Sequence, residues 1–134
     1  MTRYVPSLTG NLDQLRRQAE SALMAGVDMA LVTPMVIGMP SFHTLVREYR
    51  DLAFMAHPAL AGAVRIDPAV LLGTIFRLFG ADATVFPNHG GRFGYSQETC
   101  HDLAHAALGR WHGLDACVPV PAGGMTVERV PEML

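Results

Sequence analysis

The residues best suited to chemistry gather in one loop, between Pro87 and Ser96. Asn88, His89 and Arg92 stand there among glycines, which let the backbone approach a ligand closely. A short apolar run before the loop predicts the end of a buried strand, and Ser96 is a typical cap for a following helix. Strand, glycine loop and helix in this order can bind an anion, because loop amides and a helix N-terminus present positive dipole ends. A plain turn is the alternative interpretation.

Two further groups of candidate residues follow predicted strands. His57 comes directly after one short apolar run, and Gly123 with Gly124 follows another. Amides of paired glycines donate well to phosphate, and an arginine such as Arg92 binds phosphate or carboxylate through its planar fork of donors. The alternatives are a buried histidine satisfied by a carbonyl, a solvated loop arginine and a tight glycine turn.

Composition limits the chemistry that the protein can perform. Half of the 134 residues are apolar, 16% are charged and the formal net charge is −2, which predicts one domain with a real core. That charge gives no broad positive field for nucleic acid or an anionic membrane. All ten Lys+Arg positions are arginine, so Schiff-base chemistry, a carbamylated lysine and a P-loop lysine are excluded within this sequence.

The cysteines and the apolar runs predict a cytoplasmic protein. Cys100 and Cys117 form no CxxC pair, which is typical of reduced thiols. No apolar run reaches the length of a membrane span, and the first residues lack the hydrophobic block of a signal peptide. His101 and His105 are spaced to share a metal on a helix, but they lack a third ligand motif, which favours a solvated helix face.

Apolar runs alternate with amphipathic segments along the whole chain. Strands are expected at 4–8, 29–32, 52–56, 84–86 and 117–120, and helices at 12–25, 42–50, 68–79 and 97–108, with a last one starting at 130. The expected helix caps are Asn11, Ser41, Asp67 and Ser96. Alternation of this kind specifies right-handed βαβ units and a parallel sheet. Two α/β architectures fit: an open doubly wound sheet, or part of a (β/α)8 barrel.

Three motifs follow in order at the ends of consecutive predicted strands. They are Phe54-Met55-Ala56-His57-Pro58-Ala59-Leu60, then Gly80-Ala81-Asp82 leading into Phe86-Pro87-Asn88 and Gly90-Gly91-Arg92-Phe93, and finally Pro119-Val120-Pro121-Ala122-Gly123-Gly124-Met125. Together they resemble the catalytic barrel of the RuBisCO large-chain superfamily, specifically that of a RuBisCO-like protein. The resemblance implies a partial (β/α)8 TIM barrel that runs from about strand 3 to strand 7. Residues 1–134 would then be an incomplete barrel domain similar to the C-terminal domain of the RuBisCO large chain.

The resemblance also assigns roles to the candidate residues. It makes His57 the strand-five histidine that contacts substrate oxygens, and it places Arg92 in the mobile loop after strand six; these two are the catalytic candidates. The implied substrate- and phosphate-binding residues are Asn88, His89, Gly91, Gly123 and Gly124. All of them lie just past predicted strand ends, where barrel enzymes build their sites.

Departures from the pattern of the carboxylases narrow the expected reaction. Arg92 stands where carboxylases have a lysine that steadies the carboxylated intermediate, which argues against CO2 fixation. Ala122 replaces a serine and Pro58 replaces an arginine, so a monophosphate is expected rather than a bisphosphate.

The resemblance therefore implies part of an enzyme that acts on a phosphorylated sugar-derived oxo-acid through a magnesium-stabilised enediolate, of the decarboxylase or transcarboxylase type. Alternatives are a tautomerase or enolase of methionine salvage, an inactive truncated chain, one half of a split barrel, and a phosphate-binding open α/β module. The Mg2+ ligands are expected outside this chain, and the isolated chain is expected to be inactive. The expected partners are a phosphorylated small molecule and a second subunit or complementary barrel fragment, with no nucleic acid and no membrane.

Overall fold

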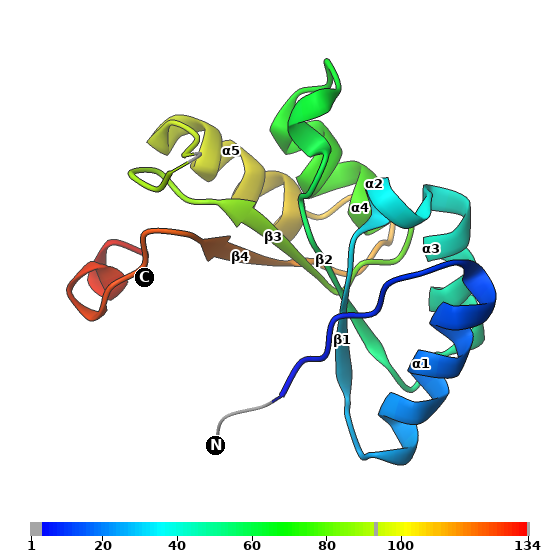
Figure 1. The fold of residues 1–134 in the computed structure, drawn as a ribbon. Coiled ribbons are helices and arrows are strands. Elements are labelled where there is room, and N and C mark those ends of the chain that lie inside the picture. The colour runs from blue at the N-terminus through cyan, green and yellow to red at the C-terminus, as the bar shows by residue number, and fades with distance from the viewer. Residues whose placement is uncertain (1–3, 93, 134) are drawn as a thin grey trace.

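The computed structural model describes residues 4–92 and 94–133 (Figure 1). Phe93 of the loop motif lies outside the described residues, as do Met1, Thr2, Arg3 and Leu134. Four strands form one sheet: β1 (Met29–Val32), β2 (Ala53–Ala56), β3 (Ala83–Pro87) and β4 (Val118–Ala122). The predicted strand positions are confirmed to within two residues at each end, except for the first.

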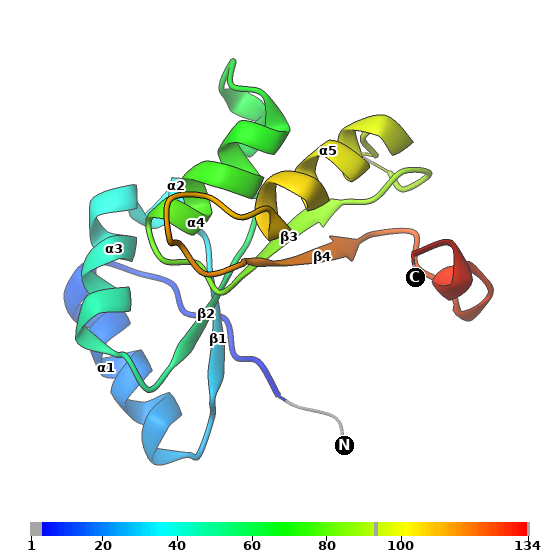
Figure 2. The ribbon, with the colours of Figure 1, turned by 180° about the vertical axis from the view of Figure 1, so that it is seen from behind.

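All three strand pairs are parallel, and the strands lie side by side in the order of the chain. The register places Leu31 opposite Met55, Met55 opposite Ala83 and Ala83 opposite Val118. The curved sheet carries helices α1 to α5 on one side, as the two opposite views show (Figures 1 and 2). This is the expected α/β architecture of a partial barrel.

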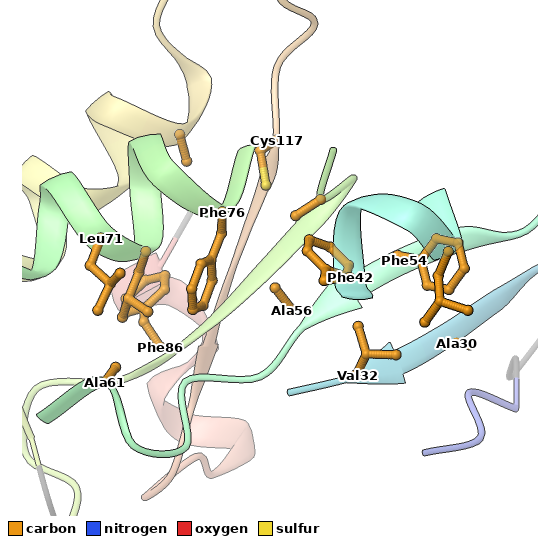
Figure 3. Close-up of a cluster of buried hydrophobic side chains, with 14 of the residues drawn as sticks. Ala30, Val32, Phe42, Phe54, Ala56, Ala61, Leu71, Phe76, Phe86 and Cys117 are labelled. Carbon is orange, nitrogen blue, oxygen red and sulfur yellow. The ribbon is translucent and has the colours of Figure 1, made fainter. Parts of the chain in front are cut away.

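Strand residues alternate between two environments because successive side chains point to opposite faces of a sheet. Ala30, Val32, Phe54 and Ala56 are buried against the helices. Figure 3 shows this cluster, in which Phe42 meets Phe54 edge to face with ring centroids 6.2 Å apart. The intervening residues of β1 and β2 are only half-buried, so the other face of the sheet is apolar and partly open there, while Ala83 on the same face of β3 is buried.

The first predicted strand is shorter than expected. Residues 4–8 make a single parallel bridge, between Ser7 and Leu31, with Leu8 N–H donating to Leu31 O at 2.8 Å and Leu31 N–H donating to Pro6 O at 2.8 Å. Pro6 has no N–H to donate, and the described segment forms no extended ladder with β1.

The helices α1 (Leu12–Met24) and α5 (Gln97–Leu108) match their predictions closely. Asn11 accepts a hydrogen bond from Gln14 N–H at 2.9 Å and forms a capping box, while Ser96 accepts one from Thr99 N–H at 3.1 Å. These side chains satisfy amide groups that the first helical turn leaves unpaired.

The sequence predicted no helix between residue 32 and Ser41, and a helix capped by Ser41; both predictions were wrong. A short helix, α2 (Pro34–Ile37), lies in this segment. The next helix, α3 (Met39–Glu48), begins two residues before Ser41, which lies inside it and caps nothing. Both helices have a proline in their first turn, where its fixed φ favours helix initiation and its missing N–H costs nothing. Gly38, at φ 88°, joins them.

The helix predicted at 68–79 is present, but most of it is not α-helical. Asp67 caps it as expected, accepting from Ala69 N–H at 2.9 Å and Val70 N–H at 3.2 Å. The segment Ala69–Ile75 is a π-helix, and only Phe76–Leu78 returns to α geometry as α4. A 3-10 turn at Ala61–Ala63 precedes it.

One buried arginine fixes the connection between α5 and β4. Arg77 is 5% exposed and donates hydrogen bonds to Gly109 O at 2.7 Å, Leu114 O at 2.8 Å and Asp115 O at 2.6 Å. Buried charge of this kind is tolerated because carbonyl oxygens surround it.

The polypeptide then follows β4 to a last 3-10 segment, Val127–Met133, close to the predicted final helix. In the described part of the sequence, no helix is long and apolar enough to cross a membrane.

Candidate functional site

The loops that follow β2, β3 and β4 surround one cavity of about 560 Å³ at the carboxyl ends of the strands. Five predicted site residues line it: His57, Asn88, Gly91, Arg92 and Gly123. Parallel strands in sequential order explain this grouping, because their carboxyl ends all meet at the same rim. The rest of the wall is mostly apolar and includes Pro58, Ala59, Leu60, Val85, Phe86, Pro87, Tyr95 and Ala122.

His57 is held in a defined orientation directly after β2. Its backbone N–H donates to Val32 O at 2.7 Å, and its ring Nδ1 accepts a hydrogen bond from Ala59 N–H at 3.1 Å. A nitrogen that accepts from an amide carries no proton, so the neutral ring bears its proton on Nε2. His57 can therefore donate a hydrogen bond from Nε2 to an oxygen bound in the cavity.

Asn88 links the end of β3 to the end of β4. It is 3% exposed, its backbone N–H donates to Ala122 O at 2.8 Å, and its side-chain Nδ2 lies 3.8 Å from Met125 Sδ. Gly91 N–H closes the turn by donating to Asn88 O at 3.2 Å. With so little of its surface on the cavity wall, Asn88 is better placed to shape the loop than to contact a ligand.

Arg92 brings a permanent positive charge to the cavity wall. It lies exposed in the loop after β3. A guanidinium at the edge of a largely apolar wall gives the cavity a preference for anionic groups, because Coulomb attraction is stronger where water is partly excluded.

Gly123 and Gly124 follow β4 with φ of 86° and 65°, a left-handed conformation that favours glycine. A Cβ atom on Gly124 would lie 3.2 Å from Gly91 Cα and 3.3 Å from Gly90 O, so the two glycine loops pack backbone to backbone. Among the described residues, none accepts a hydrogen bond from the amides of Gly123 or Gly124. Successive amides in this conformation are suited to bind phosphate oxygens.

Two predicted residues do not line this cavity, His89 and Gly124. His89 lines a smaller cavity of about 140 Å³ beside α5 and β4, together with Gln97, Cys100 and His101. Burial raises the pKa of the Cys100 thiol, so this second cavity holds no activated nucleophile at that position.

Three residues near the main cavity were not predicted as site residues. Leu60 lies on its wall with φ 65°, Tyr95 lies on it with its phenol pKa raised by burial, and Arg129 contacts the glycine loops from the final 3-10 segment. The raised pKa keeps the Tyr95 hydroxyl protonated as a hydrogen-bond donor. Tyr95 carried a sequence signal, as a phenol beside the loop, whereas Leu60 and Arg129 carried none.

The described residues do not fit a magnesium site. No group of three or more His, Cys, Asp or Glu residues that could hold a metal ion occurs among them. Asp82 lies at the opposite ends of the strands, where its carboxylate accepts a hydrogen bond from Phe54 N–H at 2.8 Å. That contact ties β2 to β3 and serves stability, as expected for this face of a barrel.

Known proteins are similar to this chain over nearly its whole length. The chain is 58% identical over 133 residues to the protein named 5-methylthioribulose-1-phosphate isomerase of Rhodospirillum rubrum, and 49% identical over 131 residues to ribulose bisphosphate carboxylase-like protein 1 of Rhodopseudomonas palustris. These matches cover 99% and 98% of this chain but 36% of each relative. The chain thus spans about a third of the length of the curated relatives it matches. A scan of protein-family models finds no match.

The solved structures give the same result. The Rubisco-like protein from Rhodopseudomonas palustris superposes with a TM-score of 0.95 at 50% identity, over 99% of this chain and 38% of that one. Octameric and dimeric archaeal Rubiscos, at 21% and 17% identity and TM-scores of 0.87 and 0.78, share the fold. Fold and rim loops together define a segment of a (β/α)8 barrel. The homologues of this chain are RuBisCO-like proteins.

Proposed function

We propose that this chain supplies the phosphate-binding and carbonyl-binding part of the active site of a RuBisCO-like isomerase, and that the substrate is a phosphorylated 5-methylthio sugar. The observation that carries the proposal is the grouping of His57, Arg92 and Gly123 around one largely apolar cavity at the strand ends. The name of the 58% identical relative supports the substrate class and favours isomerisation over the decarboxylation that the sequence suggested.

Each part of the cavity has a task in this proposal. The amides of Gly123 and Gly124 and the guanidinium of Arg92 bind the single phosphate. His57 donates a hydrogen bond from Nε2 to the substrate oxygen that becomes negatively charged as a proton leaves the neighbouring carbon. The apolar wall around Leu60 accommodates the methylthio end, which has no hydrogen-bonding groups to satisfy.

The group that removes the proton is not among these residues, and we assign it to the part of the protein outside this chain. Any magnesium would also be held there, because the described residues offer no suitable cluster. Residues 1–134 act in this proposal as an incomplete barrel domain. A second subunit or the remaining barrel completes the site, in keeping with the dimeric and octameric Rubiscos of the same fold.

A second candidate, a decarboxylase or transcarboxylase acting on a phosphorylated oxo-acid, is favoured by one observation. Arg92 on the cavity wall is as well suited to a substrate carboxylate as to a phosphate. The two candidates differ in what leaves the carbon next to the carbonyl, a proton or CO2, so product analysis separates them.

A chimeric enzyme tests the proposal. The matching 133 residues of the Rhodospirillum rubrum relative are replaced by this chain, and the chimera is assayed with 5-methylthioribulose 1-phosphate and, separately, with a phosphorylated oxo-acid. We expect isomerisation of the methylthio sugar without CO2 release. The His57→Ala chimera should lose about 100-fold in kcat, the lower range for removing a group that stabilises charge in the transition state.

The matched control is the His43→Ala chimera, which changes a histidine on α3 whose ring lies beside Phe79 and away from the cavity. It should keep the activity of the parent chimera. A chimera that folds, by circular dichroism and gel filtration, yet acts on neither substrate contradicts the proposed function. CO2 release from the oxo-acid would select the second candidate.

A further inference from the structure

Arg129 joins the two glycine loops of the candidate site. Its Nη1 donates a hydrogen bond to Gly124 O at 3.1 Å, in the loop after β4, and its Nη2 donates to His89 O at 2.9 Å, in the loop after β3. Arg129 is half-buried, although Glu128 and Val130 on either side are exposed. The side chain is therefore directed into the molecule rather than into solvent.

The guanidinium group lies directly against glycine backbone. A Cβ atom on Gly90 would come within 3.3 Å of Nη1 and 3.4 Å of Nη2, and one on Gly124 within 3.5 Å of Nη1. Both glycines have positive φ. Absence of side chains here lets one planar group reach both loops at once, which a single ammonium could not do in the same geometry.

Binding a carbonyl oxygen also fixes the amide on the other side of the same planar peptide unit. Arg129 thus sets the orientation of the peptide units 89–90 and 124–125, and it holds the loop after β3 at a fixed distance from the loop after β4. The amides of Gly123 and Gly124 lie on one of these loops and Arg92 on the other.

We infer that Arg129 is a positioning residue that holds the two glycine loops together so that their groups bind one phosphate jointly. The inference rests on the proposed function, because it takes the cavity at the strand ends as the phosphate site. Arg129 acts in it through the carbonyls it binds and not through its charge.

Ligand titration of the 134-residue protein by amide NMR tests this, with ribose 5-phosphate and ribose as the two probes. The wild type should bind the phosphorylated sugar more tightly, with the amide signals of Gly123 and Gly124 moving. Arg129→Gln and Arg129→Lys should both lose about 10-fold in affinity for ribose 5-phosphate, because neither replacement has two donor nitrogens spaced like Nη1 and Nη2. Their affinity for ribose should not change.

Two further variants keep the test decisive. Arg110→Gln removes the same charge from an exposed residue that does not line the main cavity, and it should bind like the wild type. Gly90→Ala leaves Arg129 intact but places a methyl group against its guanidinium, and it should lose phosphate affinity as the Arg129 variants do. It also answers the question if the Arg129 variants do not fold.

The possible results are distinguishable. If Arg129→Lys binds ribose 5-phosphate as tightly as the wild type, only the charge of Arg129 matters. If a folded Gly90→Ala variant keeps full affinity, the spacing between the two loops does not matter. Either result overturns the inference and leaves the proposed function standing. A wild type that does not distinguish ribose 5-phosphate from ribose overturns the proposed function, and the inference with it.

Discussion

Leu60 holds a backbone conformation that leucine rarely adopts. Its φ is 65°, and its side chain is largely exposed on the wall of the cavity rather than packed in the core. In the left-handed region the Cβ atom crowds the following carbonyl, which costs about 1 to 2 kcal/mol for residues other than glycine. A strained residue beside a cavity is a reason to look for a role in ligand contact.

Replacing Leu60 separates the strain from the contact. Leu60→Gly and Leu60→Ala remove the same apolar surface, but only glycine relieves the strain, so Leu60→Gly should be more stable than Leu60→Ala by about 1 kcal/mol. Urea unfolding measures this difference. In the chimera, both variants should raise KM for the methylthio sugar phosphate. Equal stability of the two variants would mean that the conformation carries no strain.

Cys117 makes the protein less stable at alkaline pH. Burial, together with the negative charge of Asp82, raises the pKa of its thiol to about 12. In the unfolded state this thiol ionises near pH 8.5 to 9, so the stability that the neutral thiol provides is complete below about that pH and is lost as pH rises toward 12.

Comparison of unfolding at about pH 7.5 and about pH 9.5 checks this. The wild type should lose about 1 kcal/mol more than Cys117→Ala between the two pH values, since the alanine variant cannot ionise there. Tyr49 and Tyr95, whose pKa values burial also raises, are present in both proteins and cancel in the difference. Identical pH dependence of the two proteins would contradict the buried, neutral thiol.

At the residue scale, local chemistry decided what could be predicted. Asn11, Asp67 and Ser96 were predicted as caps because they act on amides two or three residues away. Arg129 was missed because its partners lie in loops that only the folded sheet brings near, the more distant being 40 residues away in sequence. His89 illustrates the converse: its place in the loop motif was clear, but not which of two cavities it would line.

Among the elements, the π-helix and α5 are in very close contact. Gly73 lies in the π-helix, and a Cβ atom on it would be 2.7 Å from Ala106 Cβ and 2.9 Å from Leu103 O. The second of these is a backbone atom and cannot turn aside. The absence of a side chain at Gly73 therefore lets the two helices approach, which in turn positions Cys100 and Leu103 in the core.

Gly73→Ala should destabilise the protein in spite of the better helix propensity of alanine. Overpacking costs about 1 to 3 kcal/mol, and contacts as short as 2.7 and 2.9 Å place this case at about 2 to 3 kcal/mol. The propensity gain is about 1 kcal/mol, so we expect a net loss of about 1 to 2 kcal/mol in urea unfolding. Gly62→Ala is the matched control, because nothing lies within 4 Å of its Cβ position, and it should be neutral. A neutral Gly73→Ala would show that the helices separate at little cost.

Strand order, helix sequence and most boundaries could be predicted because apolar periodicity and turn residues report on each element separately. The short helix α2, which begins with a proline, was predicted as a loop, because proline and glycine occur both in loops and at the ends of helices. The π-helix could not be predicted, because no local residue pattern distinguished it from an α-helix, and the close approach of Gly73 to α5 is a contact between distant residues. The motifs at the strand ends predicted a barrel, whereas apolar periodicity alone did not distinguish a barrel from an open sheet.

The molecule as a whole has one protected and one open face. Helices α1 to α5 lie on one side of the sheet (Figure 2), and the row Leu31, Met55, Ala83 and Val118 belongs to the other. Val118 at the end of this row is 56% exposed. On β4, Val118 N–H donates to Asp82 O toward β3, so the N–H positions of Pro119 and Pro121 fall on the outer edge, where proline leaves no donor. We therefore expect the open face, rather than this edge, to drive association.

A charge on the open face should reduce association of the isolated protein. Val118→Lys should lower the fraction of dimers and larger species in analytical ultracentrifugation, because the ammonium cannot be buried between two apolar faces without a large cost. Val36→Lys is the control: Val36 is 55% exposed but lies on α2, on the helix side, and its variant should associate like the wild type. If both variants associate equally, the open face is not the contact surface.

The sequential order of the strands bears on how the protein is made. Each strand pairs with the one synthesised immediately before it, as Ala53 does with Met29 and Val118 with Ala83. A nascent polypeptide leaving the ribosome can add one strand and its helix at a time, and each addition covers the apolar side of the last. The groups proposed to bind the substrate are synthesised in the same order, from His57 to Gly124, and Arg129 follows them, so the two glycine loops are joined only after Arg129 has emerged.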